Sequence, residues 1–365
     1  MVDEIIVHFG MHKTGSTSIQ KAFARDLDDP RFHYINLGDP NQSRYLITLF
    51  MDRPHLHHTH IALGIDESDI PLLREKTEAE FLRELRNAEG RTAILSAEVI
   101  GILPLKVLKR LYAFLGRHAR RIRAVGYVRS PRGYVESLFQ QRVKGGLASL
   151  DVPRLWPSYR ESFAKLEQVF GKSQVEYWLF DPTRFPGQDV VRDFAGRMGV
   201  AWEAGRPIRS NEGLSLGALK LLYALRRHGV PRPGPESRRG DIKLIQELSS
   251  LPGPKLCFGY DLVAEVLDGR VSDIRWMEDR LGEALDLGFE RTGTDCIRSE
   301  ADLLRFQRTE LSWLAGVTGK PVPDQDVSAD EVGRWVAELR EQLVSRKGSK
   351  TTETAHDRVL SWLSR

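Results

Sequence analysis

A glycine-containing turn between an apolar strand pattern and a helix start constrains this chain more than any other feature. Residues 4–20 read EIIVHFGMHKTGSTSIQ, with Gly10 and Gly15 spaced as in the phosphate-binding pattern G-x-x-x-x-G-K-[ST]. Successive backbone N–H groups in such a turn, together with the positive end of the following helix, favour a bound anion. The stretch therefore predicts a phosphate cradle.

The lysine of this pattern is displaced. In nucleoside triphosphatases it follows the second glycine and reaches the β- and γ-phosphates, whereas here it lies inside the turn as Lys13. The displacement argues against ATP hydrolysis, and an ordinary capped strand-to-helix turn is the less favoured alternative. We expect the anion to be held by Lys13, Thr14, Gly15, Ser16, Thr17 and Ser18.

A second candidate anion site lies in residues 123–142, RAVGYVRSPRGYVESLFQQR. An apolar strand ends there at Arg129, and a helix is expected to start near Pro131. Arg129 at the carboxyl end of a parallel strand would point into the crevice where open α/β sheets bind ligands, and Ser137 would lie one to two turns into the helix. Alone, the segment would suggest a local ion pair and a surface serine; with the first segment, it predicts a second phosphate site.

The two segments, in this order, resemble the motifs of sulfotransferases that use 3'-phosphoadenosine 5'-phosphosulfate (PAPS). In that family a loop resembling residues 12–17 holds the 5'-phosphosulfate, and an arginine and serine spaced as Arg129 and Ser137 hold the 3'-phosphate. The sequence HKTGSTSIQ is most similar to the corresponding loop of bacterial members of the family. The resemblance implies PAPS as co-substrate, a hydroxyl acceptor, release of adenosine 3',5'-bisphosphate and no metal. A carbohydrate or glycoconjugate is the favoured acceptor, and amine, lipid and phenol acceptors stay open.

Sulfuryl transfer needs an in-line acceptor, a base and positive charge on the reacting oxygens. Lys13 is our candidate for the positive charge, as the resemblance also implies. For the base we favour Glu98, at the end of the predicted strand TAILSAE, although it could equally cap a helix. His12 is the second candidate because it adjoins Lys13, whereas His8 is expected to be packed in the core.

The hydrophobic pattern predicts an α/β fold with a mostly parallel P-loop-type sheet flanked by helices, followed by a largely helical C-terminal half. We expect a core over residues 1–205, a helical region over 206–345 that completes the acceptor site, and a spacer with a short helix over 346–365. The expected strands are 4–9, 33–37, 92–97, 122–128 and 174–180. The expected helices are 16–26, 69–88, 103–116, 131–143, 214–228, 239–250, 260–285, 299–317, 328–345 and 355–364.

Composition excludes several classes of protein. The 365 residues carry a net charge of +4, too small to indicate nucleic-acid binding, and no run is apolar enough to span a bilayer. The N-terminus lacks a basic region with a cleavage site, so we expect a cytoplasmic protein. Cys257 and Cys296 are far apart, without metal-type spacing, and are expected to be buried free thiols. The basic run at residues 117–123 is expected to form a solvated turn.

Two other readings stay open. Asp181, at the end of VEYWLFD, could mimic the magnesium-binding aspartate of P-loop enzymes, which would make the chain a small-molecule kinase using magnesium ATP. If Glu98 and the nearby histidines are structural, the chain could instead be a noncatalytic nucleotide-binding module. A group of histidines, His55, His57, His58 and His60, lacks acidic partners and is not expected to be a metal site. We expect a solvated loop, and the less favoured alternative is a substrate-facing loop over the active site.

Overall fold

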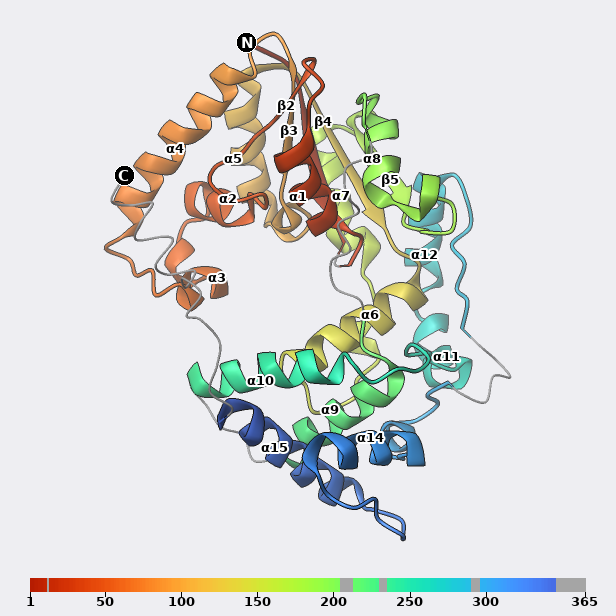
Figure 1. Ribbon diagram of the computed structural model, residues 1–365. Helices are drawn as coiled ribbons and strands as arrows, with labels where there is room; N and C mark the ends of the chain where they lie inside the picture. The colour runs from red at the N-terminus through yellow and green to blue at the C-terminus, as the bar shows by residue number, and fades with distance from the viewer. Residues whose placement is uncertain (12, 204–212, 230–234, 290–295, 346–365) are drawn as a thin grey trace.

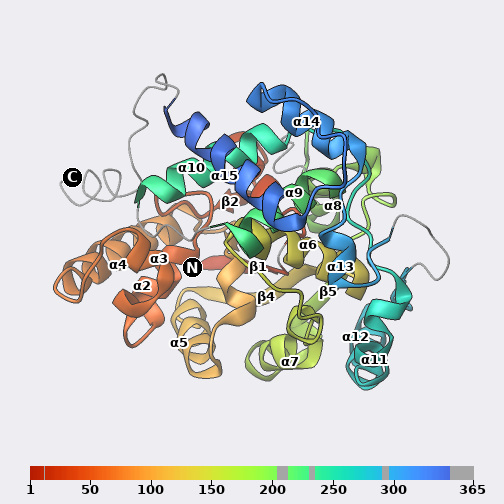
Figure 2. The same ribbon diagram turned by 90° about the horizontal axis from the view of Figure 1, so that it is seen from below.

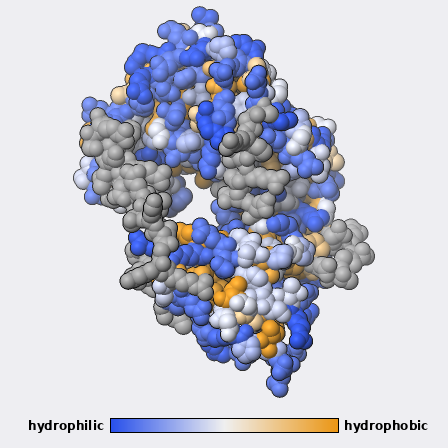
Figure 3. All heavy atoms as spheres, in the orientation of Figure 1, coloured by the Kyte–Doolittle hydropathy of each residue, from blue (hydrophilic) through white to orange (hydrophobic). Residues whose placement is uncertain are grey.

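The computed structural model describes residues 1–11, 13–203, 213–229, 235–289 and 296–345. Figure 1 shows two parts, an α/β part that contains a single sheet and, below it, a layer of helices that come mainly from the C-terminal half and include α6 (Pro131–Lys144). The carboxyl ends of the strands point toward that layer, and Figure 3 shows a gap between the two parts. The chain is an α/β protein whose second half is mainly helical.

The sheet has five strands in the order β2-β3-β1-β4-β5, and every neighbouring pair is parallel. All five expected strands are confirmed within a few residues. Their bounds are β1 Val2–Gly10, β2 Phe32–Tyr34, β3 Thr92–Ser96, β4 Ala119–Val128 and β5 Val175–Leu179.

Strand β1 separates two apolar cores because its side chains alternate between the faces of the sheet. Ile5, Val7 and Phe9 belong to a large core that extends into the helical layer, whereas Ile6 packs in a smaller core on the other face. Both faces of β1 are therefore buried, as expected for a central strand of a parallel sheet covered on both sides.

Helices cover both faces of the sheet (Figures 1 and 2). Helices α1 and α8 pack on the smaller core, and α4, α5 and α7 pack on the larger one. The four expected helices of this half are confirmed. The bounds are α1 Ser16–Asp26, α2 Ser43–Phe50, α3 His58–Ala62, α4 Ile70–Asn87, α5 Leu105–Gly116, α6 Pro131–Lys144, α7 Tyr159–Phe170 and α8 Val190–Met198, with short 3-10 turns η1 Pro54–Leu56, η2 Glu98–Ile102, η3 Pro153–Leu155, η4 Lys172–Gln174 and η5 Pro186–Gln188.

The helical layer is built around α9 and α15. A Cβ added to Gly333 of α15 would lie 2.7 Å from the carbonyl oxygen of Ala224 in α9, so only glycine permits this close backbone approach. The described helices are α9 Leu216–His228, α10 Pro235–Leu248, α11 Tyr260–Asp268, α12 Val271–Leu281, α13 Glu300–Leu303, α14 Arg308–Thr318 and α15 Ala329–Ser345. The helix expected over residues 355–364 lies outside the described residues.

Two long helices expected in this layer are each divided in two. The pattern over residues 260–285 breaks at Gly269, which is costly inside a helix and ends α11. The pattern over residues 299–317 contains two separate helix starts, because Ser299 with Asp302 and Gln307 with Glu310 each form a reciprocal capping box. A glycine and the capping side chains therefore end these helices, although the apolar pattern continues past the breaks.

The expectation of two free thiols is wrong, because Cys257 and Cys296 form a disulfide. Residues 257–259 and 296–297 lie side by side through a parallel bridge between Phe258 and Ile297, with Ile297 N–H donating to the Cys257 carbonyl at 2.8 Å. The two cysteines are 39 residues apart in the sequence, and nothing in the sequence indicated that their backbones pair.

The basic run at residues 117–123 is mostly strand rather than turn, because β4 starts at Ala119. Arg123 reaches across neighbouring strands to Glu4 on β1 and Glu176 on β5, at 3.3 and 2.8 Å. This run does lie at the amino ends of the strands, away from the glycine turn. Separately, no helix in the described ranges is both long and apolar enough to cross a bilayer.

Candidate functional site

The strand order creates a crevice at the carboxyl end of β1. From β1 the chain first builds β2 and β3 on one side, then β4 and β5 on the other, so the connections after β1 and β4 diverge. Ligands of open α/β sheets bind at such a switch point. The register places the turn after Gly10, Glu98 after β3 and Arg129 after β4 at this one edge.

The turn after β1 is closed by its own short side chains. The buried Thr14 hydroxyl donates to the Met11 carbonyl at 2.8 Å and lies 3.4 Å from the Ser16 hydroxyl. A Cβ added to Gly10 would lie 2.6 Å from that Ser16 oxygen, so the first glycine makes room for the serine. The Thr14 hydroxyl thus has a hydrogen-bond partner within the loop and stabilises the loop conformation.

Two left-handed positions, one on either side of Thr14, shape the rest of the turn. Lys13 has a φ of 67° and Gly15 a φ of 75°. A non-glycine residue in this region is uncommon and marks strain, and the Lys13 side chain is exposed. A Cβ on Gly15 would lie 2.7 Å from Val190 Cγ1, so the first turn of α8 packs directly on the loop.

Helix α1 begins immediately after the turn, at Ser16. Its N-cap Gly15 provides no side-chain hydrogen bond, so the first N–H groups of the helix have no side-chain cap. Ser16 and Ser18 are buried and Thr17 is half-buried at this end. An uncapped helix start bordered by hydroxyls is suited to an anion.

Arg129 joins the second predicted segment to the first. Its Nη1 donates to the Lys13 carbonyl at 2.9 Å, and its guanidinium carbon lies 5.3 Å from the centre of the Phe180 ring. Burial lowers the pKa of Arg129 from its ordinary value. A Cβ on Gly133 would lie 3.2 Å from Arg129 Nε, so this glycine, which sequence reasoning missed, leaves space for the guanidinium.

Helix α6 carries the other predicted residue of that segment. Ser137 is half-buried in the second turn of α6. Lys144, two turns further along and also half-buried, was missed in the sequence. The pKa of Lys144 is lowered, first by burial and then by the charges of Lys13 and Lys255. The helix therefore brings a second lysine near the one in the turn.

Glu98 opens the 3-10 turn η2 and lies beside the glycine turn. It helps to line a pocket with Gly10 and Met11 from the turn and with Tyr134, Tyr159 and Phe163. The side chain is half-buried, and no side chain caps η2, so the capping role considered for Glu98 is not observed among the described residues. Burial raises the pKa of Tyr134 in this pocket. A carboxylate thus faces a partly aromatic pocket at the head of the turn.

Of the two histidines nearest the turn, His12 and His8, the structure describes only His8, and His12 lies outside the described residues. His8 is buried, as expected, with its Nδ1 2.7 Å from the Ser96 hydroxyl and its ring 4.8 Å from that of Phe194. Burial lowers the pKa of His8 to about 3, so it is neutral at physiological pH.

The histidine-rich segment is not simply a solvated loop, because His60 is buried and its Nε2 lies 2.9 Å from the Thr48 hydroxyl. His55 and His57 are half-buried and only His58 is exposed. Across the described part of the chain, no group of three or more His, Cys, Asp or Glu side chains is arranged to hold a metal ion.

The position of Asp181 does not suit a magnesium-binding aspartate. It follows the edge strand β5, which β4 separates from β1. Its Oδ1 accepts hydrogen bonds from the N–H and hydroxyl of Thr183, at 3.0 and 2.7 Å. The carboxylate therefore organises its own turn.

Comparison with known proteins finds distant structural likenesses, among them two sulfotransferases. No family model and no curated protein matches the chain. A sulfotransferase from Alicyclobacillus acidocaldarius is 18% identical, over 66% of this chain and 99% of that one, with a TM-score of 0.38. A sulfotransferase domain from the curacin biosynthetic pathway is 15% identical, over 57% of this chain and 79% of that one, with a TM-score of 0.34. These values are too low to carry an argument about function.

Proposed function

We propose that the chain is a PAPS-dependent sulfotransferase that transfers a sulfuryl group to an acceptor hydroxyl. The observation that carries the proposal is the hydrogen bond from Arg129 Nη1 to the Lys13 carbonyl. This contact joins two anion-binding segments, whose sequences resemble the PAPS motifs, into one site. A nucleotide with phosphate groups at both ends of its ribose fits two adjacent anion sites.

In the proposed complex, the turn and the start of α1 hold the 5'-phosphosulfate through backbone N–H groups, Lys13, Ser16 and Thr17. Arg129 and Ser137 hold the 3'-phosphate. The braced loop and the half-buried Arg129 are held in place before the nucleotide binds, so little reorganisation is needed as the charge shifts in the transition state.

The transfer step is an in-line displacement at sulfur. The acceptor oxygen forms the new S–O bond while the bond from sulfur to the 5'-phosphate oxygen breaks. Glu98 takes the acceptor proton, and the Lys13 ammonium stabilises the negative charge that develops on the leaving phosphate. Glu98 is the better supported base because it lines the pocket beside the turn. His12 remains the second candidate.

The acceptor hydroxyl enters the pocket that Glu98 lines, whose volume of about 40 Å³ leaves the rest of the acceptor outside it. The half-buried Tyr134 offers aromatic surface there, while Glu98 and Ser158 offer polar partners. Such a lining suits a hydroxyl group on an apolar or ring-shaped acceptor, and a carbohydrate is one member of that class. The core at residues 1–205 would supply the chemistry, and the helical region at 206–345 would complete the acceptor site.

The location of the protein is a separate question. The cytoplasmic location expected from the sequence stays a prediction, and the Cys257–Cys296 bond weighs against it because stable disulfides are rare in the cytosol. Trapping free thiols in intact cells, followed by a mass measurement, separates the two cases. Two alkylated cysteines indicate a reducing compartment, whereas an unmodified pair indicates an oxidising one.

Product formation tests the proposal. The purified protein is incubated with PAPS and a panel of sugar, phenol, alcohol and amine acceptors, and the release of adenosine 3',5'-bisphosphate is measured. We expect acceptor-dependent release without added metal. Glu98→Gln should lower turnover by about a hundredfold or more while leaving nucleotide affinity unchanged, because only the proton acceptor is removed.

The same assay separates the other two readings. A small-molecule kinase would instead consume magnesium ATP, which the position of Asp181 does not favour. A noncatalytic nucleotide-binding module would bind adenosine 3',5'-bisphosphate and release none from PAPS with any acceptor. Near-normal turnover of a folded Glu98→Gln protein would move the role of base to another residue.

A further inference from the structure

Three lysines from separate parts of the chain gather at the candidate site. Lys13 lies in the glycine turn, Lys144 at the end of α6, and Lys255 in the segment that follows α10. The charges of Lys13 and Lys255 both disfavour protonation of Lys144. Within the described ranges none of the three lysines forms an ion pair with a carboxylate, so their mutual repulsion is left uncompensated.

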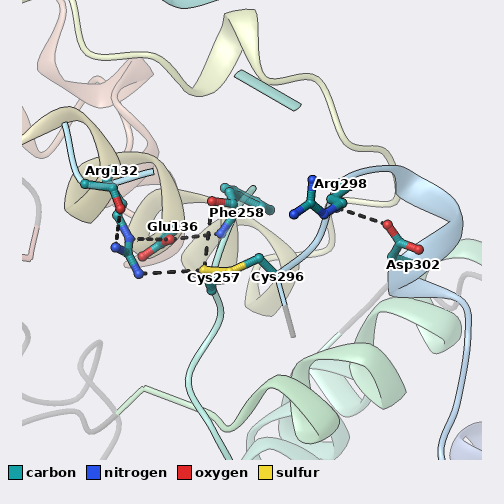
Figure 4. Close-up of a disulfide and its surroundings, with 8 residues drawn as sticks. Arg132, Glu136, Cys257, Phe258, Cys296, Arg298 and Asp302 are labelled. Carbon is teal, nitrogen blue, oxygen red and sulfur yellow. Dashed lines mark hydrogen bonds and ion pairs between the residues drawn. A yellow bond between two sulfur atoms is a disulfide. The ribbon is translucent and has the colours of Figure 1, made fainter. Parts of the chain in front are cut away.

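Lys255 is held in place by contacts on both sides of it. Its Nζ donates to the Gly213 carbonyl, and the neighbouring Pro254 carbonyl accepts from Leu216 N–H at 2.7 Å. On the other side, the disulfide of Cys257 anchors the segment to Cys296 (Figure 4). Lys255 itself is exposed, but these contacts on both sides restrain the segment that carries it.

The same segment is attached to α6, the helix that carries Ser137. Glu136 Oε1 accepts from Phe258 N–H at 3.0 Å and from Arg132 Nε at 3.1 Å, and Arg132 Nη2 lies 3.6 Å from Cys257 Sγ (Figure 4). Further along α6, Gln140 Oε1 accepts from Leu214 N–H at 3.0 Å. The segments around 214 and 257 thus lie along α6.

Helix geometry aligns Lys144 with the proposed phosphate contact. Ser137 and Lys144 are seven residues apart, or about two turns, so they lie on the same face of α6. That face begins beside Arg129, whose side chain reaches the glycine turn. A second anionic group held by Arg129 and Ser137 would lie within the field of all three lysines.

We propose that Lys144 and Lys255 bind the 3'-phosphate of the nucleotide together with Arg129 and Ser137. This inference rests on the function proposed above. The two lysines would supply positive charge that a nucleotide with only a 5'-phosphate does not use. An anionic group on the acceptor has the same chemistry, and the experiment separates these two sources.

The experiment is a calorimetric titration of the full chain with adenosine 3',5'-bisphosphate and, in parallel, with adenosine 5'-phosphate. We expect Lys144→Ala and Lys255→Ala each to weaken bisphosphate binding about tenfold, the loss of roughly one charge-assisted contact. Affinity for the monophosphate should stay unchanged, and Lys144→Arg should retain bisphosphate affinity. Lys106→Ala, an exposed lysine of α5 paired with Asp52, is the matched control.

Three outcomes overturn the inference. Unchanged bisphosphate affinity in both alanine variants would do so, and if the KM for an acidic acceptor rose instead, the lysines would belong to the acceptor site. An equal loss for both nucleotides would indicate a structural effect rather than a 3'-phosphate contact. A wild-type protein that binds neither nucleotide would contradict the proposed function itself, whatever the variants do.

Discussion

In the proposed site, the glycine turn after β1 and the segment after β4 would hold anions in different ways. The turn relies on backbone N–H groups and on a shape set by near neighbours in sequence, such as Thr14 bonded to Met11. The second anion position would rely on long cations, namely Arg129 after β4 and Lys255, which lies more than a hundred residues further along the chain. A binding turn made of neighbouring residues can be recognised from a short sequence. A site assembled from cations that are distant in the sequence can be recognised only once the fold is known.

The largest predicted effect tests whether the turn acts through charge or through shape. Lys13→Ala should lower turnover about a hundredfold, or about 2.7 kcal/mol, because it removes the cation at the leaving phosphate. Lys13→Gly removes the same charge but accommodates the left-handed backbone, so it should lose as much. Full activity in Lys13→Gly would show that the turn needs only its shape, and steady-state kinetics decides between these outcomes.

The second prediction concerns the disulfide that anchors the segment carrying Lys255. Replacing both Cys257 and Cys296 by serine should lower the free energy of unfolding by roughly 2–4 kcal/mol, because the unfolded chain is no longer cross-linked. Bisphosphate affinity should fall as Lys255 becomes less restrained. The chain has only these two cysteines, so reducing the wild-type protein is an independent control. Equal denaturation curves before and after reduction would show that the bond does not stabilise the fold.

A third prediction separates backbone strain from packing in the turn. Gly15→Ala should destabilise the protein by about 2–3 kcal/mol, since it combines an unfavourable φ with a clash against Val190. Gly90→Ala is the matched control because Gly90 has a φ of +70° and no atom within 4 Å of an added Cβ, so it should cost about 1 kcal/mol. The double variant Gly15→Ala with Val190→Ala should recover part of the difference in urea denaturation. Equal costs at both glycines would mean that α8 does not pack on the turn.

The smallest effect tests the core beneath the turn. The pKa of His8 is lowered to about 3 by burial, so between about pH 6.5 and 3 the unfolded chain binds a proton that the folded chain does not. Stability should therefore fall with decreasing pH in this window, with His8 contributing about 1.4 kcal/mol per unit. His8→Asn should show a shallower slope between pH 6 and 5, where few carboxylates titrate. Equal slopes of unfolding free energy against pH in the wild-type and variant proteins would mean that His8 is accessible to solvent in the folded protein.

Much of the α/β part was predictable because its signals are local. Alternation and apolar runs located all five strands, and the glycine turn was recognised from its spacing. The order of segments also placed Arg129 at the same sheet edge as the turn, and His8 in the core.

What the sequence did not show depends on contacts between distant residues. The disulfide arises from a backbone bridge between Phe258 and Ile297. Gly133 and Val190 matter only because Arg129 and Gly15 pack against them. The burial of His60 and the grouping of Lys144 with Lys13 likewise follow from helices meeting in space. Residues of this kind have no motif of their own.

The central claim is that the turn and the segment after β4 form one site for a nucleotide with phosphates at two positions. Calorimetric titration of the wild-type protein with adenosine 3',5'-bisphosphate, and in parallel with ATP and magnesium, tests it most directly. We predict tight binding of the bisphosphate and weak or no binding of magnesium ATP. A preference for magnesium ATP would contradict the account and favour a phosphoryl-transfer enzyme.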